Sequence, residues 1–313
     1  MYIFLLTFPQ KYYIRKMARD GVPVIDMQKV EGLGEELVRA CVEWGCFRMI
    51  NHGVAMELMA EMKATAASLL DLPEEIKQRT VHTEQGKGYV ERNQGTPFFE
   101  TLSVDEISSP GEFCDRLDAS PHQREVIYKY IKAIRELAGL LGRKLMEGSG
   151  LAGDLFDGWC CQLRMNKYHY CPESVGLSGV GMHSDPTFLT ILQDDENVNG
   201  LQVVDKYSGE FAPVDPVPGS LAVNVGDIAK AWSNGRFCNV KHRVRCFEPK
   251  TRYSIVLFVL GPNDTKVEAP SELVDSDHPR LYVPIDIKEY RHVRTSKRLH
   301  TGDALDIFST TAT

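Results

Sequence analysis

The stretch GMHSDPTFLTILQDD, residues 181–195, decides the fold because it sets two polar side chains at the start of a buried strand. The run FLTILQ, residues 188–193, is rich in apolar and β-branched residues and is bounded by turn formers, which is typical of a strand inside a sheet. Residues two apart in a strand point to the same face, so His183 and Asp185 can converge on one ion. A turn closed by two polar residues would explain the same pair.

Short β-rich runs continue on both sides of this stretch. They are separated by Gly, Pro, Asn and Asp, and no helical pattern intervenes between them. This spacing predicts a two-sheet antiparallel jelly roll, also described as a double-stranded β-helix. The runs are 162–170, 188–193, 201–205, 220–228, 240–246 and 253–260.

The first half of the chain has a different pattern. Apolar residues recur at helical spacing in residues 30–45, 56–71 and 121–149. The expected fold class is therefore α+β, with a jelly-roll core and an N-terminal helical region packed on it. Residues 85–113 follow neither period, so a long irregular loop is expected there.

The change of pattern near residue 150 predicts two parts of the chain. Residues 17–150 form the mainly helical N-terminal region, and residues 151–313 form the jelly-roll domain with a C-terminal helix. Residues 1–16 are expected to be a disordered extension or the product of an alternative start upstream of Met17.

Composition limits the class of partner. The 313 residues carry a formal net charge of −7, which gives no reason to expect binding to nucleic acid or to an acidic membrane surface. The eight cysteines lack the paired spacing of a zinc site and the density of a disulfide framework, so reduced thiols in a cytoplasmic protein are expected. The apolar opening MYIFLLTF is too short to cross a membrane. A small molecule is the expected partner, and no obligatory protein partner is evident.

A third candidate metal ligand, His242, lies in the strand-like run VKHRVRC at 240–246. Two imidazoles and one carboxylate on one face of an octahedral ion leave three positions open, which is the arrangement of non-haem Fe(II) oxygenases. Zinc accepts the same ligands, although catalytic zinc usually keeps one open position. The candidate ligands are therefore His183, Asp185 and His242.

Candidate co-substrate residues follow on the next strand, where Arg252 and Ser254 share one face. A guanidinium fork binds a carboxylate through two parallel hydrogen bonds, and a neighbouring hydroxyl adds a third. Tyr168, on another expected strand, supplies a phenolic donor. A dicarboxylate co-substrate would accept hydrogen bonds from all three side chains.

Each of these residues taken alone has a simpler explanation: a polar turn, a packed histidine or a surface ion pair. Their order along the chain favours an oxygenase, and motifs for nucleotide binding or serine hydrolysis are absent. An alternative of another class is a jelly-roll binding protein that keeps a metal site without catalysis. The acidic run Asp194-Asp195-Glu196 lacks the ligand spacing of a calcium loop and is expected to be a solvated turn.

Longer segments carry a family resemblance. The chain resembles the plant 2-oxoglutarate and Fe(II)-dependent dioxygenases in PVIDM at 23–27, WGCFRMINHGV at 44–54, NKYHY at 166–170, WSNGRFCNVKHRV at 232–244 and RYSIVLF at 252–258. The resemblance implies that His183, Asp185 and His242 bind iron. It further implies that Arg252 and Ser254 hold the distal carboxylate of 2-oxoglutarate, that Tyr168 assists, and that O2 is consumed with ascorbate as a possible stimulant.

Within that family, QDDENV at 193–198 and ELVD at 272–275 are similar to the members that oxidise auxin. This resemblance implies oxidation of indole-3-acetic acid to 2-oxindole-3-acetic acid. The alternative is a sister dioxygenase acting on a gibberellin, a flavonoid or another specialised metabolite. The expected contacts for a flat aromatic acid are Phe98, Phe99, Pro186 and Phe188, since aromatic rings pack well against it.

Overall fold

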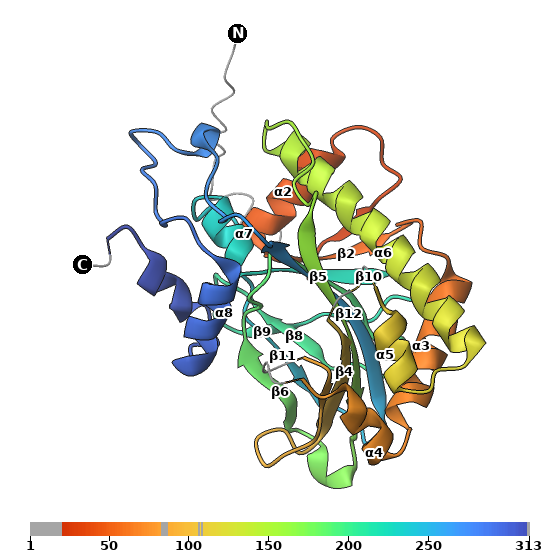
Figure 1. The fold of residues 1–313 in the computed structure, drawn as a ribbon. Helices are drawn as coiled ribbons and strands as arrows, with labels where there is room; N and C mark the ends of the chain where they lie inside the picture. The colour runs from red at the N-terminus through yellow and green to blue at the C-terminus, as the bar shows by residue number, and fades with distance from the viewer. Residues whose placement is uncertain (1–20, 83–86, 106, 108, 312–313) are drawn as a thin grey trace.

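The computed structural model describes residues 21–82, 87–105, 107 and 109–311, so the expected extension at 1–16 and Met17 lie outside the described residues. Two β-sheets form the core of the described chain, and helices cover one side of the larger sheet (Figure 1). The predicted α+β class with a jelly-roll core is confirmed.

The larger sheet contains eight strands in the order β1-β2-β10-β7-β12-β5-β4-β3. Its neighbours pair antiparallel, except that β1 and β2 are parallel. The smaller sheet has the order β6-β11-β8-β9 and is antiparallel throughout. The strands are β1 Val24–Asp26, β2 Cys46–Ile50, β3 Tyr89–Val90, β4 Phe99–Val104, β5 Trp159–Tyr168, β6 Ser178–His183, β7 Leu189–Gln193, β8 Leu201–Val204, β9 Phe211–Pro213, β10 Leu221–Val225, β11 His242–Arg245 and β12 Arg252–Pro262.

The helices of the first half lie together beside the larger sheet (Figure 1), where α3 packs on α6, β5 and β12. Leu37, Met62, Ile127 and Leu163 are buried in the hydrophobic core that these elements share. Burial of such apolar side chains is the main stabilising contribution to the fold. The helices are α2 Leu33–Glu43, α3 Met56–Leu70, α4 Glu74–Lys77, α5 Gly111–Arg116, α6 Pro121–Gly148, α7 Asp227–Trp232 and α8 Ile287–Ser296, with short 3-10 helices at Gln78–Thr80, Pro172–Ser174, Ser271–Leu273 and Asp303–Phe308.

The longest helix, α6, begins where the sequence predicts. The Ser120 hydroxyl accepts a hydrogen bond from the backbone N–H of Gln123, and the Gln123 side chain accepts one from the Ser120 backbone N–H. This capping box satisfies two N–H groups that have no partner within the helix, and Pro121 fits the first helical position because its missing N–H is not needed there. The three predicted N-terminal helices are all present.

The expectation of an irregular loop at 85–113 was wrong in part. Residues Phe99–Val104 form β4, which pairs along its whole length with β5 and lies in the larger sheet. The strand was missed because Glu100 interrupts its apolar pattern, yet this glutamate is buried beside Lys77, which comes from a helix 23 residues earlier. A pattern of hydrophobicity does not reveal such a distant partner.

The acidic run at 194–196 was also misread as a solvated turn. Asp194 and Asp195 are buried, and their carboxylates lie 2.7 Å from Arg48 and 2.8 Å from Lys63. Buried carboxylates require paired cations or hydrogen bonds, and here both cations come from the N-terminal half. Glu196 alone of the three is exposed.

Two further expectations concern the cysteines and the membrane. All eight cysteines are free thiols, as predicted. Within the described ranges, no helix has both the length and the apolar character that a bilayer crossing requires.

Candidate metal centre

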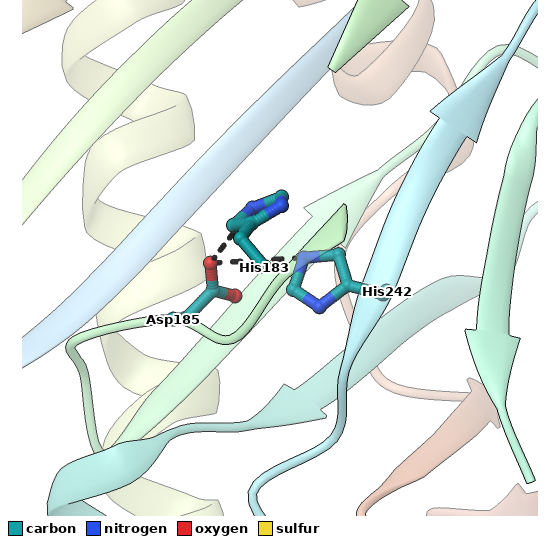
Figure 2. Close-up of side chains that lie close together, drawn as sticks. All are labelled: His183, Asp185 and His242. Atoms are coloured by element: carbon teal, nitrogen blue, oxygen red, sulfur yellow. Dashed lines mark ion pairs between the residues drawn. The ribbon is translucent and has the colours of Figure 1, made fainter. Parts of the chain in front are cut away.

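The smaller sheet brings the two candidate histidines together. His183 ends β6, His242 begins β11, and the antiparallel register makes them direct cross-strand partners. Their ring centroids are 4.2 Å apart. Asp185 follows β6 after one intervening residue, and its carboxylate turns back toward both rings (Figure 2). Residues 57 positions apart in sequence therefore share one site.

The geometry of the three side chains suits a single metal ion. Asp185 Oδ1 lies 3.5 Å from Nε2 of His183 and 3.7 Å from Nε2 of His242. Metal–ligand bonds of about 2.1 Å place neighbouring ligands of an octahedral ion about 3 Å apart, so a small inward movement would complete coordination. Across the described residues, this is the one cluster of three or more such side chains close enough to share an ion.

Both imidazoles are oriented for coordination through Nε2. Nδ1 of His183 lies 2.9 Å from the carbonyl oxygen of Gly181, and Nδ1 of His242 lies 3.2 Å from that of Val240. An N–H donated to a carbonyl fixes the tautomer and leaves the Nε2 lone pair free for a metal. Burial lowers the pKa of His242 to about 4, so this imidazole is neutral at physiological pH.

The two carboxylate oxygens of Asp185 have different neighbours. Oδ2 accepts a hydrogen bond of 2.7 Å from the Thr190 hydroxyl, while Oδ1 faces the histidines. Burial would raise the pKa of Asp185, but the two histidines and Thr190 outweigh it and hold that pKa well below its usual range. The side chain is thus ionised and could offer one oxygen, Oδ1, to a metal ion.

Arg252 and Tyr168 lie on the larger sheet, as opposed residues of β12 and β5. Tyr168 points toward the smaller sheet, since a Cβ on Gly179 of β6 would come within 2.7 Å of its ring. Arg252 is 1% exposed, its Nε donates to the carbonyl of Val198, and its Nη1 has no hydrogen-bond partner among the described residues. Because a buried guanidinium N–H without an acceptor is costly, the site suits an incoming carboxylate.

Ser254 and its neighbour complete this polar face. The Ser254 hydroxyl is buried and accepts a hydrogen bond of 3.1 Å from the Asn166 amide. Burial raises the pKa of the Tyr168 phenol, with Arg252 and Ser254 opposing the rise, so the phenol keeps its proton and can donate. The residues at this face fit the distal carboxylate of 2-oxoglutarate.

The four expected substrate contacts lie in different environments. Phe98 and Phe99 are half-buried beside Tyr168, with the Phe99 and Tyr168 ring centroids 5.1 Å apart. Pro186 is half-buried immediately after Asp185. The expectation for Phe188 was wrong, because its ring is fully buried in the main core, edge-on to Phe156, Trp159 and Trp232.

Three polar side chains near the site were missed from the sequence: Asn166, Thr190 and Arg164. Asn166 and Arg164 lie two and four residues before Tyr168 on β5, so strand alternation alone could have placed them on the same face. The Arg164 guanidinium lies 5.1 Å above the Phe258 ring and donates to Gln162. Burial and the nearby Arg291 lower the pKa of Arg164 to about 10. Asp105 and Asp185 raise this pKa, but they offset the lowering only in part.

A jelly roll that presents an open His-Asp-His triad opposite a buried arginine defines the class of non-haem Fe(II) and 2-oxoglutarate-dependent dioxygenases. The chain belongs to the 2OG-Fe(II) oxygenase superfamily, whose model matches residues 159–261. A second model, the N-terminal region of the non-haem dioxygenase in morphine synthesis, matches residues 22–123. The protein is therefore a dioxygenase that uses Fe(II), 2-oxoglutarate and O2. The alternative of a non-catalytic jelly-roll binding protein is not supported.

Several similar proteins are plant enzymes. The chain is 46% identical over 292 residues to the 2-oxoglutarate-dependent dioxygenase DAO of Oryza sativa subsp. indica, covering 91% of this chain and 97% of the relative. A crystal structure of the rice dioxygenase for auxin oxidation has a TM-score of 0.85 and 44% identity, covering 92% of this chain and 100% of that one. The complex of dioxygenase for auxin oxidation 1 from Arabidopsis thaliana with 2-oxoglutarate has a TM-score of 0.80 and 51% identity, covering 83% and 100%.

Proposed function

We propose that this dioxygenase oxidises a small aromatic carboxylic acid, and that the acid is indole-3-acetic acid, converted to 2-oxindole-3-acetic acid. The observation that carries the proposal is the likeness to two solved dioxygenases for auxin oxidation over most of the chain. A sister reaction on a gibberellin, a flavonoid or another specialised metabolite is the alternative outcome.

In this proposal His183, Asp185 and His242 bind the iron, and Arg252, Ser254 and Tyr168 bind the distal carboxylate of 2-oxoglutarate. A metal bound by these residues would supply the oxidative chemistry in which one oxygen atom of O2 converts 2-oxoglutarate to succinate and CO2 and the other is added to the substrate. The protein residues position both reactants and exclude water, which is the usual division of labour in cofactor enzymes. His183, whose side chain is 23% exposed against 7% for His242, is the ligand nearest to the open side of the site.

A substrate acid requires a cation, and Arg164 supports this part of the proposal. Its guanidinium lies on the same face of β5 as Tyr168, and Asp185 and Tyr168 are close enough to influence its pKa. A guanidinium binds a carboxylate bidentately, which would fix the direction in which a flat ring approaches the metal. Phe98 and Phe99, beside Tyr168, are the proposed ring contacts, with Pro186 at the turn after Asp185.

A cavity of about 660 Å³ adjoins this part of the sheet, a volume suited to a small molecule. Its wall includes Ser103, which lies opposite Arg164 in the β4–β5 register, and Asp105, which accepts a hydrogen bond from Gln162. The rest of its described lining comes mainly from α5, α6 and the start of β5 and includes none of the proposed metal, co-substrate or substrate residues, so the cavity carries no part of this proposal.

The test is succinate release by the purified chain with Fe(II), 2-oxoglutarate and ascorbate, screened over candidate substrates. Indole-3-acetic acid should stimulate release and give a product heavier by one oxygen atom. Stimulation by a gibberellin or a flavonoid but not by indole-3-acetic acid would favour the sister reaction. His242→Ala is the matched control and should abolish release with every substrate.

The composition of the chain also bears on the location of the enzyme in the cell and on its partners. We infer a cytoplasmic enzyme that acts without nucleic acid, a membrane or an obligatory protein partner. The net charge of −7 and the eight free thiols support this inference.

A further inference from the structure

The short turn between the first two candidate metal ligands is held by elements that supply no ligand. The Ser184 backbone N–H donates to the carbonyl of His300 at 2.9 Å, and the Ser184 carbonyl accepts from Nη2 of Arg294. The carbonyl of Asp185 accepts a hydrogen bond of 2.8 Å from the backbone N–H of Asp227. Helices α7 and α8 and the segment after α8 therefore fix the backbone that presents His183 and Asp185.

Arg294 connects this turn to the C-terminal segment. The side chain projects from α8 and is 6% exposed. Its guanidinium also donates to the carbonyls of His300 at 3.1 Å and of Leu299 at 3.4 Å. One planar group thus binds three carbonyl oxygens from two segments, which a point-charge ammonium cannot reproduce with the same geometry.

Asp227 links the same region to the third candidate ligand. Its fully buried carboxylate accepts hydrogen bonds of 2.7 Å from the Tyr290 hydroxyl of α8 and from the Asn239 amide. Asn239 lies three residues before His242, so one carboxylate joins α8 to the segment that leads into β11. Arg294 Nη1 lies 3.9 Å from the same carboxylate.

The C-terminal segment also packs closely against this network at Gly302. Gly302 has φ +88°, and a Cβ there would come within 2.5 Å of the Asn239 amide nitrogen. The family match ends at residue 261, whereas Tyr290, Arg294 and Gly302 all lie beyond it. Apart from the hydrogen bond from Asp227, the contacts that hold the ligand-bearing turn thus come from outside the matched segment.

We propose that Arg294 and Asp227 are positioning residues of the metal centre, which hold the turn at Ser184 and the approach to His242 in the geometry that binds the ion. The inference rests on the proposed ligand set of His183, Asp185 and His242. Residues that orient metal ligands typically change metal affinity or activity by about 10- to 100-fold when they are replaced. The C-terminal helix thereby sets the affinity of the metal site.

The experiment titrates the metal-free full chain with Co(II) and follows its visible absorption bands, which report coordination geometry, without co-substrate or turnover. Arg294→Met should raise the Co(II) dissociation constant by about 10-fold or more. Tyr290→Phe, which removes one hydrogen bond to Asp227, should raise it less, and Arg294→Lys should fall between wild type and Arg294→Met. Should Arg294→Met fail to fold, Arg294→Lys and Tyr290→Phe carry the test.

Two controls separate positioning from general stability. Arg298→Met changes an exposed arginine of the same segment, and Leu141→Ala destabilises the remote core on α6; both should keep the wild-type dissociation constant. The inference is overturned if folded Arg294→Met and Tyr290→Phe bind Co(II) like wild type, or if Leu141→Ala weakens binding as much as they do. His183→Ala tests the ligand set itself: wild-type affinity in that variant would contradict the proposed ligands and not merely their positioning.

Discussion

Arg252 and Tyr168 occupy opposed positions on β12 and β5, and the guanidinium carbon of Arg252 lies 5.1 Å from the centroid of the Tyr168 ring. Each side chain brings a hydrogen-bond donor to the same face of the larger sheet. The arrangement is possible because β12 and β5 pair antiparallel at ten positions, with a register shift only between Val259 and Gly261.

Replacing Arg252 with Met should raise the KM for 2-oxoglutarate by about 10- to 100-fold, the scale of a hydrogen bond to a charged group of about 1.5–3 kcal/mol. Steady-state succinate formation against 2-oxoglutarate concentration measures the effect. Lys250→Gln, an exposed cation in the preceding turn, is the control and should leave KM unchanged. An unaltered KM in folded Arg252→Met would remove this residue from the co-substrate site.

Replacing Thr190 with Val should weaken metal binding by about 10-fold, because Asp185 Oδ2 loses its hydrogen bond and the carboxylate can rotate. Thr190→Ser keeps the hydroxyl and should retain near wild-type affinity. Equilibrium titration with Fe(II) under anaerobic conditions compares the two. Equal affinity of the Val and Ser variants would contradict an orienting role for the hydroxyl.

A buried ion cluster on β4 predicts a pH dependence of stability. The Glu100 carboxylate accepts hydrogen bonds from Lys77 at 2.7 Å and Tyr89 at 2.9 Å, and it lies 2.5 Å from Nε2 of His169. Burial raises the pKa of Glu100, but His169, Lys77 and Tyr89 outweigh burial and lower it from 4.5 to about 2. The ionised carboxylate therefore stabilises the fold above pH 4.5, and this contribution is lost as the pH falls toward 2.

Glu100→Gln should accordingly lower the free energy of unfolding by about 3 kcal/mol at neutral pH, the scale of a broken buried ion pair. The difference from wild type should shrink as the pH falls from 4.5 to 2, where the wild-type carboxyl also becomes neutral. Urea unfolding of the metal-free proteins across this range measures it. A difference that stays constant with pH would rule out titration of Glu100 as the cause.

Phe188 and Phe99 should respond differently to truncation. Phe188→Ala should lower the free energy of unfolding by about 3–5 kcal/mol, as for other buried aromatic side chains. The milder Phe188→Leu should leave the KM for substrate unchanged, whereas Phe99→Leu should raise it, because only Phe99 lies beside Tyr168. Thermal melting and steady-state kinetics on the matched Leu variants test this, and a raised KM in Phe188→Leu alone would reverse the assignment.

Strand alternation explains much of what could be predicted. Arg252 and Ser254 were paired because residues two apart share a face, and both lie buried on β12. His183 and Asp185 also lie close together, but Asp185 follows the end of β6, so the turn and not strand alternation brings its carboxylate back toward His183. Phe188 was expected at the substrate because of its ring chemistry alone; it lies just before β7, where the chain is still turning, and its ring enters the helix-side core. Periodicity holds only within a regular strand.

The sequence by itself determined the order of chemical groups along the chain, the runs that form strands and helices, and hence the dioxygenase class. These are local properties, since they follow from side-chain type and from backbone periods of two or 3.6 residues. Only the tertiary structure decided which distant groups meet: Arg294 with Ser184, Asp227 with Asn239, and Lys77 with Glu100. Such contacts depend on how separate elements pack, and no local pattern of hydrophobicity encodes the partner of a buried charge.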